Sequence, residues 1–287
     1  MAGQRTIFLD HLTVAHAAPR TLIAAAKAGG FDGVGLFLHG MAEVVGMAEF
    51  DLVRDAAARR EVRDAAGDAG QAIAICYPFT LARNSAADDF LSGLDAAAEL
   101  GAARINLLVY DRDPARAAEA TMRLCDDAAA RGLGVAVEFF PPSAIATIES
   151  AVALCEAVGA ENLGLTVDLL HLNRSGGTLE QVRSHRHLIR LAQICDARRA
   201  APDDLFHEAA ADRMLPGDGA LDPLRFLEAC GPDVPASIEA PDFRAIGSDP
   251  MQRARDARRA LDATQDIIGG IDGPSAATDA GLSRRTA

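Results

Sequence analysis

Short runs of apolar residues alternate with longer segments of helical periodicity along almost the whole chain. The apolar runs carry few charges, which is typical of strands that are buried on both faces of a parallel sheet. The segments between them are rich in alanine, and several end at a glycine, the usual end of a helix. Eight strands are predicted, at residues 6–14, 33–38, 72–78, 104–110, 135–139, 163–170, 189–195 and 235–239.

Helices are predicted after each of these strands, and the repeated order indicates a closed (β/α)8 TIM barrel. A doubly wound open sheet is the alternative, but eight strand–helix units in a chain of this length favour closure. We expect one barrel domain over residues 1–268, a flexible tail over 269–287, and a long connection over 197–219. The predicted helices are 21–28, 54–69, 88–100, 114–131, 145–158, 179–188, 222–229 and 251–268.

Composition narrows the classes of function. The 287 residues carry a formal net charge of −13, which argues against a nucleic-acid partner and against an anionic membrane surface. No signal peptide and no membrane-spanning segment are predicted, because no apolar run is long enough. The five cysteines are widely spaced and odd in number, as expected for reduced thiols in a cytoplasmic protein.

Polar residues stand at the ends of the last four predicted strands. They are Glu138, Asp168, Gln193 and Glu239, and the ends of barrel strands are where active sites lie. A carboxylate in an apolar strand is costly unless it is paired or binds a metal. Taken singly, each residue could cap a helix or pair with an arginine. Taken together, they predict a divalent metal site, and all-oxygen ligation favours Mg²⁺ or Mn²⁺ over Zn²⁺, with Co²⁺ as a substitute.

Several segments resemble the xylose isomerase-like TIM-barrel superfamily, the sugar phosphate isomerase/epimerase-like proteins. The resemblance covers about residues 5–265 and is strongest from residue 135 onward. It implies a TIM barrel with a divalent metal held by a Glu, an Asp, a His and a second Glu. The segments that carry it are VAVEFFP at 135–141, VDLLH at 167–171, QICDA at 193–197, LPGDGALD at 215–222 and SIE at 237–239.

The resemblance also implies roles for individual residues. Gln193 stands where many members have His, a departure shared with members similar to 3-dehydroshikimate dehydratase. His171 matches a residue that contacts substrate, and Arg199 matches an arginine that orients it, with Arg198 an equally close candidate. Epimerases of the family carry a further substrate-binding Glu, and that position is Ala144 here.

These residues lead to an expected chemistry. The resemblance implies that Glu138 and Glu239 remove and return a proton next to a carbonyl, giving an isomerase or epimerase that acts through a metal-stabilised enediolate. The substrate would be a small, sugar-like hydroxy-carbonyl compound, and a homodimer is compatible with the sequence. The alternatives are a dehydratase with His171 as base and a barrel that binds a ligand without catalysis. Glu208 and Arg213 flank the turn at 216–219, where they would order the loop over the site or pair on its surface.

Overall fold

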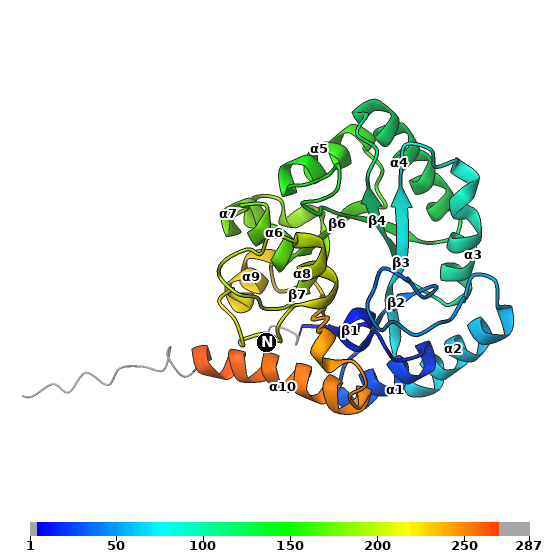
Figure 1. Cartoon of the computed structure of the whole chain (residues 1–287). Helices are drawn as coiled ribbons and strands as arrows, with labels where there is room; N and C mark the ends of the chain where they lie inside the picture. The colour runs from blue at the N-terminus through cyan, green and yellow to red at the C-terminus, as the bar shows by residue number, and fades with distance from the viewer. Residues whose placement is uncertain (1–4, 270–287) are drawn as a thin grey trace, which may run out of the picture.

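Eight parallel strands close into one barrel in the computed structural model, which describes residues 5–269 (Figure 1). Each strand pairs with its neighbours in the sequence, and β1 also pairs with β8, which closes the ring. The predicted (β/α)8 barrel is therefore confirmed. The strands are β1 (Ile7–Asp10), β2 (Gly33–Phe37), β3 (Ala72–Leu81), β4 (Arg104–Val109), β5 (Gly134–Glu138), β6 (Leu163–Asp168), β7 (Ile189–Ile194) and β8 (Ala236–Ile238).

Helices surround the barrel, and the last of them packs beside the first (Figure 1). The α-helices are α1 (Pro19–Gly29), α2 (Ala56–Ala69), α3 (Leu91–Glu99), α4 (Pro114–Ala129), α5 (Ile148–Val158), α6 (Leu169–Arg174), α7 (Leu179–Ser184), α8 (Leu205–Ala211), α9 (Pro223–Cys230) and α10 (Pro250–Gly269). Short 3₁₀ helices are η1 (His11–Val14), η2 (Ala87–Phe90), η3 (Arg186–Leu188) and η4 (Phe243–Ala245).

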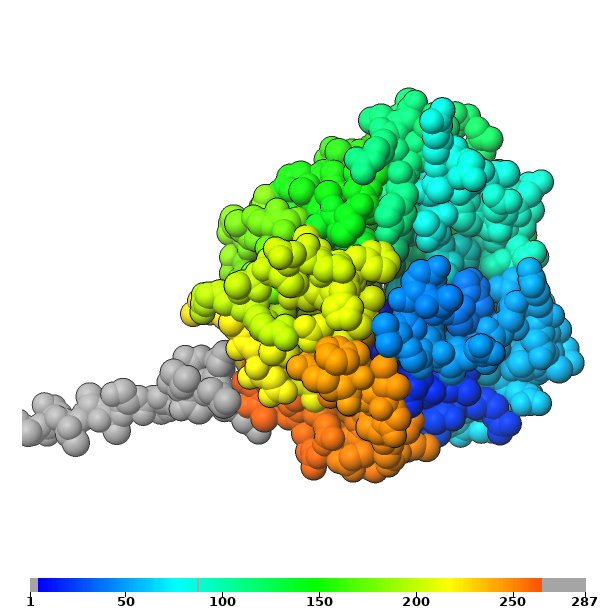
Figure 2. Space-filling view, viewed as in Figure 1, coloured from blue at the N-terminus to red at the C-terminus, as the bar shows by residue number. Residues whose placement is uncertain are grey.

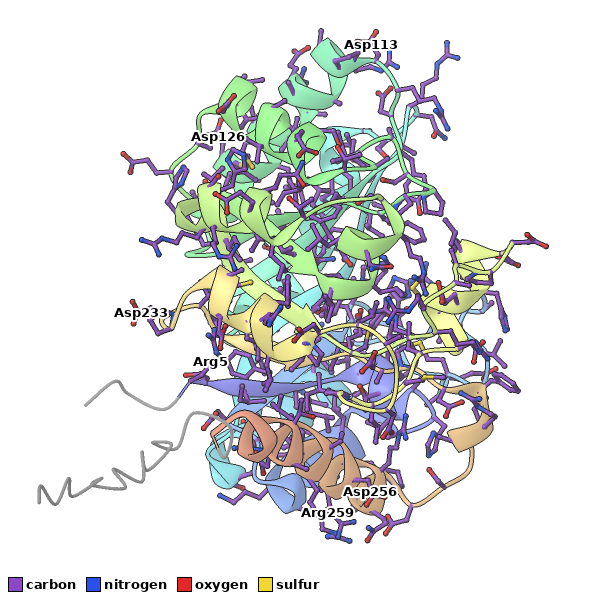
Figure 3. The ribbon with its side chains drawn as sticks, turned by 90° about the vertical axis from the view of Figure 1, so that its left-hand side faces the viewer. Arg5, Asp113, Asp126, Asp233, Asp256 and Arg259 are labelled. Carbon is purple, nitrogen blue, oxygen red and sulfur yellow. The ribbon has the colours of Figure 1, made fainter. Side chains whose placement is uncertain are left out.

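The apolar side chains of the strands form the core, and charged side chains gather on the outer faces of the helices. β1 and β6 are buried along their whole length, as the unbroken apolar runs predicted. Asp126 on α4 and Arg259 on α10 point outward (Figure 3). None of the helices within residues 5–269 is both long and apolar enough to cross a membrane.

Two predicted strands are too long, and the reason is the same for both. The strand predicted at 6–14 stops at Asp10, whose side chain accepts a hydrogen bond from Leu12 N and starts η1. The strand predicted at 163–170 stops at Asp168, which accepts from His171 N and starts α6. The residues that follow are still largely buried, so the apolar pattern continues where the strand does not. Both barrel carboxylates thus double as helix caps.

The predicted connection 197–219 contains a helix, α8, that begins after Asp204, whose side chain accepts a hydrogen bond from His207 N. This segment and the one that follows β2 lie side by side over one face of the molecule, yellow and blue in Figure 2. The predicted tail lies outside the described residues from residue 270 on, and Gly269 ends α10.

Candidate active site

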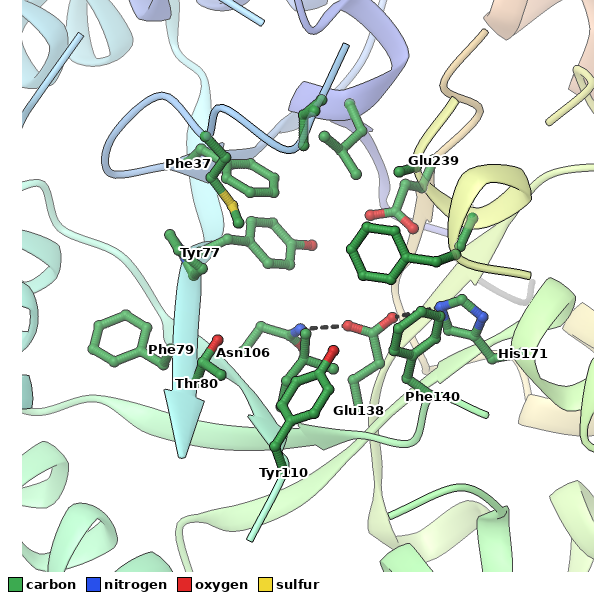
Figure 4. A pocket seen from close by; sticks show the side chains of 18 of the residues that line it. Phe37, Tyr77, Phe79, Thr80, Asn106, Tyr110, Glu138, Phe140, His171 and Glu239 are labelled. Atoms are coloured by element: carbon green, nitrogen blue, oxygen red, sulfur yellow. Dashed lines mark hydrogen bonds and ion pairs between the residues drawn. The ribbon is translucent and has the colours of Figure 1, made fainter. Parts of the chain in front are cut away.

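A cavity of about 340 Å³ opens where the strands end, the position at which barrel active sites lie. Glu138, His171 and Glu239 are among the residues that line it (Figure 4), and Arg213 lines it as well. They come from β5, α6, the segment after α8 and the end of β8, so four separate parts of the chain supply the polar groups.

Glu138 is the last residue of β5, and its carboxylate is held on both sides. Asn106 on β4 donates a hydrogen bond to Oε2, while His171 Nε2 lies 3.3 Å from Oε1 (Figure 4). Thr166 in turn donates to Asn106 Oδ1 over 2.7 Å, which fixes the orientation of the amide. The carboxylate therefore has a defined direction in the cavity before any ligand binds.

Asp168 ends β6 and joins two parts of the site. Its Oδ1 accepts from His171 N at 2.9 Å, and its Oδ2 lies 2.6 Å from Arg213 Nη1. Burial opposes ionisation, but the charges of Arg213 and His171 outweigh it and lower the pKa of Asp168. Glu138, Asp168 and His171 each bring one ligand atom within 4.8 Å of the others, a spacing that suits a shared metal ion.

Gln193 and Glu239 lie side by side. Gln193 Nε2 donates to Glu239 Oε1 at 3.0 Å and to the Tyr77 hydroxyl at 3.1 Å. Gln193 Oε1 is buried and has no hydrogen-bond partner among the described residues. A buried oxygen without a donor is costly, so this atom fits a site that a cation completes. Burial raises the pKa of Glu239 well above its usual value.

Arg213 sits at the centre of the group with a side chain that is only 2% exposed. Its Nη1 lies 2.6 Å from Asp168 Oδ2 and 2.9 Å from Glu239 Oε2, and its Nε donates to the carbonyl of Ala209 at 2.8 Å. Burial opposes the charge, but the two carboxylates outweigh it and hold the pKa of the guanidinium well above its usual value. Of the two roles considered for Glu208 and Arg213, pairing with each other on the surface is therefore wrong, and Glu208 forms a buried pair with Arg174 at 2.7 Å.

The structure brings five of the six predicted site residues into one connected group but leaves Arg199 outside it. Arg199 is exposed and does not line the cavity, and Arg198 pairs with Asp212 at 2.8 Å. After β7 the chain leaves the barrel at Asp196 and returns to it at Met214, which forms an antiparallel bridge with Asp196. Arg213 therefore reaches the strand ends although it is far from Gln193 in sequence. The predicted residues within the group are Glu138, Asp168, His171, Gln193 and Glu239.

Two residues of the group, Asp10 and Asn106, were not predicted, and Tyr77 joins the group through its hydroxyl. Tyr77 donates to Asp10 Oδ2 at 2.7 Å, and burial raises the pKa of Asp10 to about 7. All three are polar side chains in apolar strands, so the signal used for the last four strands was also present in β1, β3 and β4.

The donor atoms and the charge balance fit a divalent cation. Four buried carboxylates, those of Asp10, Glu138, Asp168 and Glu239, face the single guanidinium of Arg213 among the residues that line or support the described cavity. A cation shared by Asp168 and Glu239 would take the place of Arg213 Nη1. Arg213 holds only one oxygen of each carboxylate, so a cation that used these two oxygens would compete with the guanidinium.

The pKa of Asp10 predicts a pH dependence of folding stability. The folded protein keeps this proton up to about pH 7, whereas the unfolded chain releases it near pH 4. The contribution of Asp10 is fully present below about pH 4 and is lost as the pH rises through about 7, at up to about 1.4 kcal/mol per pH unit. We expect Asp10→Asn, which keeps the acceptor for Tyr77, to remove this slope.

Chemical denaturation of both proteins in EDTA between about pH 4 and 8 measures the difference. Asp126→Asn, at an exposed position on α4, is the matched control and should follow the unsubstituted protein. Parallel curves for Asp10→Asn and the unsubstituted protein would show that Asp10 titrates normally.

Comparison with known proteins identifies the family to which the chain is similar. The family described as xylose isomerase-like TIM barrel matches residues 23–265. An inosose isomerase from Bacillus velezensis is 32% identical over 108 residues, which cover 37% of this chain and 38% of the relative. The chain thus matches about two fifths of the length of that curated relative.

Two solved structures share the fold. A fusion protein of a xylose isomerase-like TIM barrel and 4-hydroxyphenylpyruvate dioxygenase has a TM-score of 0.78 and 23% identity, over 95% of this chain and 45% of that one. The IolI protein, crystallised with a bound zinc atom, has a TM-score of 0.72 and 16% identity, over 92% of this chain and 98% of that one. From the family match over most of its length, this chain belongs to the xylose isomerase-like TIM-barrel family.

Proposed function

We propose that this protein is a divalent-metal-dependent isomerase or epimerase that acts on a small hydroxy-carbonyl substrate. The observation that carries the proposal is the presence of two carboxylates, Glu138 and Glu239, on the walls of one cavity beside further buried oxygen donors. One curated relative is named an inosose isomerase, and this name supports an isomerase.

Glu138, Asp168, Gln193 and Glu239 would hold the cation, with Mn²⁺ or Mg²⁺ favoured by the all-oxygen donor set and Co²⁺ or Zn²⁺ as substitutes. The zinc atom bound by the IolI structure supports a metal in this fold. When bound, the cation would supply positive charge that stabilises the negative charge of an enediolate.

The side chains of this chain would carry out the proton transfers. Glu138 takes the proton from the carbon next to the carbonyl, because Asn106 and His171 already hold its carboxylate in one orientation. Glu239 reaches the cavity from a different side (Figure 4) and returns a proton there, which inverts the carbon or moves the carbonyl.

A dehydratase is the second candidate, and the position of His171 favours it. His171 lines the cavity and contacts Glu138, so it could take the proton next to the carbonyl and pass it to a hydroxyl on the next carbon. That hydroxyl leaves as water, and an unsaturated carbonyl compound remains. Gln193, the residue shared with 3-dehydroshikimate dehydratase-like proteins, supports the same reading.

Solvent deuterium exchange tests the proposal. We expect the Mn²⁺-loaded protein in heavy water to place one deuterium next to the carbonyl of a compound from a panel of inososes, ketohexoses and hydroxyketones. EDTA should lower the rate by roughly 100-fold or more, because the charge that stabilises the enediolate is lost.

Mass spectrometry follows the exchange, and ultraviolet absorbance detects the conjugated product of dehydration when 3-dehydroshikimate is added to the panel. Loss of water without retained deuterium would identify the dehydratase. Tight binding of a panel compound with no exchange and no loss of water would identify a barrel that binds without catalysis.

A further inference from the structure

Away from the carboxylates, the walls of the cavity are apolar. Aromatic rings from β2, β3, the end of β4, β5 and α8 face the space, together with aliphatic side chains from the segment after β2 (Figure 4). The cavity therefore combines a charged group with apolar rings that extend up to it, since the ring of Phe140 lies 4.8 Å from that of His171. The aromatic residues are Phe37, Tyr77, Phe79, Tyr110, Phe140 and Phe206.

Few polar groups remain to meet a substrate in the apolar part. The Tyr77 hydroxyl already donates to Asp10 and accepts from Gln193, and the Asn106 amide is engaged by Glu138 and Thr166. The hydroxyls of Thr80 and Tyr110 also line the cavity and make no hydrogen bond with the described residues, so they can pair with substrate hydroxyls. A free sugar would bring more hydroxyls than these two can satisfy, and the others would lose their water without gaining a partner. A phosphate group would need a free cation, and Arg213, the guanidinium among the lining residues, is shared by two carboxylates.

Phe206 adds an independent observation at the mouth of the cavity. It lies on α8, is 47% exposed, and its ring packs against Phe140 with 5.9 Å between centroids. Ala209 and Ala210, on the next turn of the same helix, also line the cavity and leave room beside the ring. An exposed phenyl group at the rim of an apolar cavity is placed to cover an apolar ligand.

We infer that the substrate carries an uncharged apolar part, a ring or a branched hydrocarbon, next to its hydroxy-carbonyl group. The apolar part lies among the aromatic side chains, while the hydroxy-carbonyl group reaches Glu138 and Glu239. This inference rests on the proposed function for the reacting end, and it narrows the substrate to amphipathic hydroxy-carbonyl compounds instead of free or phosphorylated sugars.

Two small ligands that share the reacting group test the inference. 2-Hydroxyacetophenone and dihydroxyacetone have the same hydroxymethyl ketone, but the first carries a phenyl ring where the second carries a hydroxymethyl group. In calorimetric titrations of the full chain loaded with Mn²⁺, we expect the phenyl compound to bind at least about 10-fold more tightly, because its ring leaves water for the aromatic wall. Fructose 6-phosphate should bind more weakly than either compound.

Variants locate the effect within the cavity. Phe206→Ser should weaken binding of the phenyl compound by roughly 3- to 10-fold and leave dihydroxyacetone within about twofold, since only the apolar contact is lost. Met41→Gln, nearly equal in size, should act in the same direction, because Met41 also lines the cavity. Phe243→Ser is the matched control, because Phe243 is 45% exposed and does not line the cavity.

The outcomes separate this inference from the proposed function. Equal or tighter binding of dihydroxyacetone or fructose 6-phosphate would overturn the inferred substrate class, even if deuterium exchange into a polar compound upheld the enzyme. Selective binding of the phenyl compound with no deuterium exchange would uphold the ligand class and remove the proposed catalysis. Equal effects of Phe206→Ser and Phe243→Ser would place the ligand elsewhere on the molecule.

Discussion

Replacing Glu239 with glutamine is expected to lower the rate of metal-dependent deuterium exchange by roughly 10³-fold, because one of the two proton-transferring carboxylates is lost. Glutamine has the same shape and keeps an oxygen that can accept from Gln193 or Arg213, so the fold should survive. The loss of the negative charge also weakens the metal site. Exchange rate, bound Mn²⁺ and melting temperature measure the three effects separately.

Glu156→Gln provides the control, because it makes the same chemical change at an exposed position on α5. It should leave metal content and exchange unchanged. A Glu239→Gln protein with full metal content and full exchange would show that Glu239 has no part in the site.

Replacing Arg213 with methionine is expected to have the largest effect on stability, a loss of roughly 3–5 kcal/mol in EDTA. Methionine removes the guanidinium that pairs with both Asp168 and Glu239, and it leaves two buried carboxylates without a counter-charge. Mn²⁺ at about 100 times its Kd for the variant should return about 2.7 kcal/mol, because a ligand that binds only the folded protein stabilises it by that amount at this concentration. Denaturation with EDTA and with Mn²⁺ measures both quantities.

The competition between arginine and metal gives this experiment a second readout. The Arg213→Met protein should bind Mn²⁺ more tightly than the unsubstituted protein, in which Arg213 shares both carboxylates and repels a cation. Arg20→Met removes an exposed ion pair with Glu61 and should change stability by less than about 1 kcal/mol. A loss as small as that for Arg213→Met, or weaker Mn²⁺ binding by it, would contradict the shared position.

The barrel and most of the polar group follow from one rule of the fold. Parallel strands in a closed barrel all end on the same side, so residues at the ends of β5 to β8 must meet whatever their separation in sequence. Glu138, Asp168, Gln193 and Glu239 could therefore be grouped without coordinates. The strand ends themselves were harder to place, since Asp10 and Asp168 cap turns that continue the apolar pattern.

Arg213 could not be predicted in the same way. Its position depends on where the segment after β7 returns to the barrel, and that return is made by backbone hydrogen bonds between Asp196 and Met214, which carry no side-chain pattern. The aromatic lining of the cavity could not be assigned from the sequence, for a different reason. Residues such as Phe37 and Phe79 are almost fully buried, so in the sequence they cannot be told from core residues.

The bridge between Asp196 and Met214 also bears on how this barrel can diverge. This bridge closes the base of the segment that carries α8, and the pairs Glu208–Arg174 and Arg213–Asp168 tie the segment to α6 and to the end of β6. Residues of the segment outside these pairs can change without moving the strands. Phe206 lies on α8 within this segment, whereas the acidic residues of the site lie at the ends of the barrel strands. Ligand preference can thus drift through insertions and exchanges in a single loop while the acid–base machinery is inherited intact.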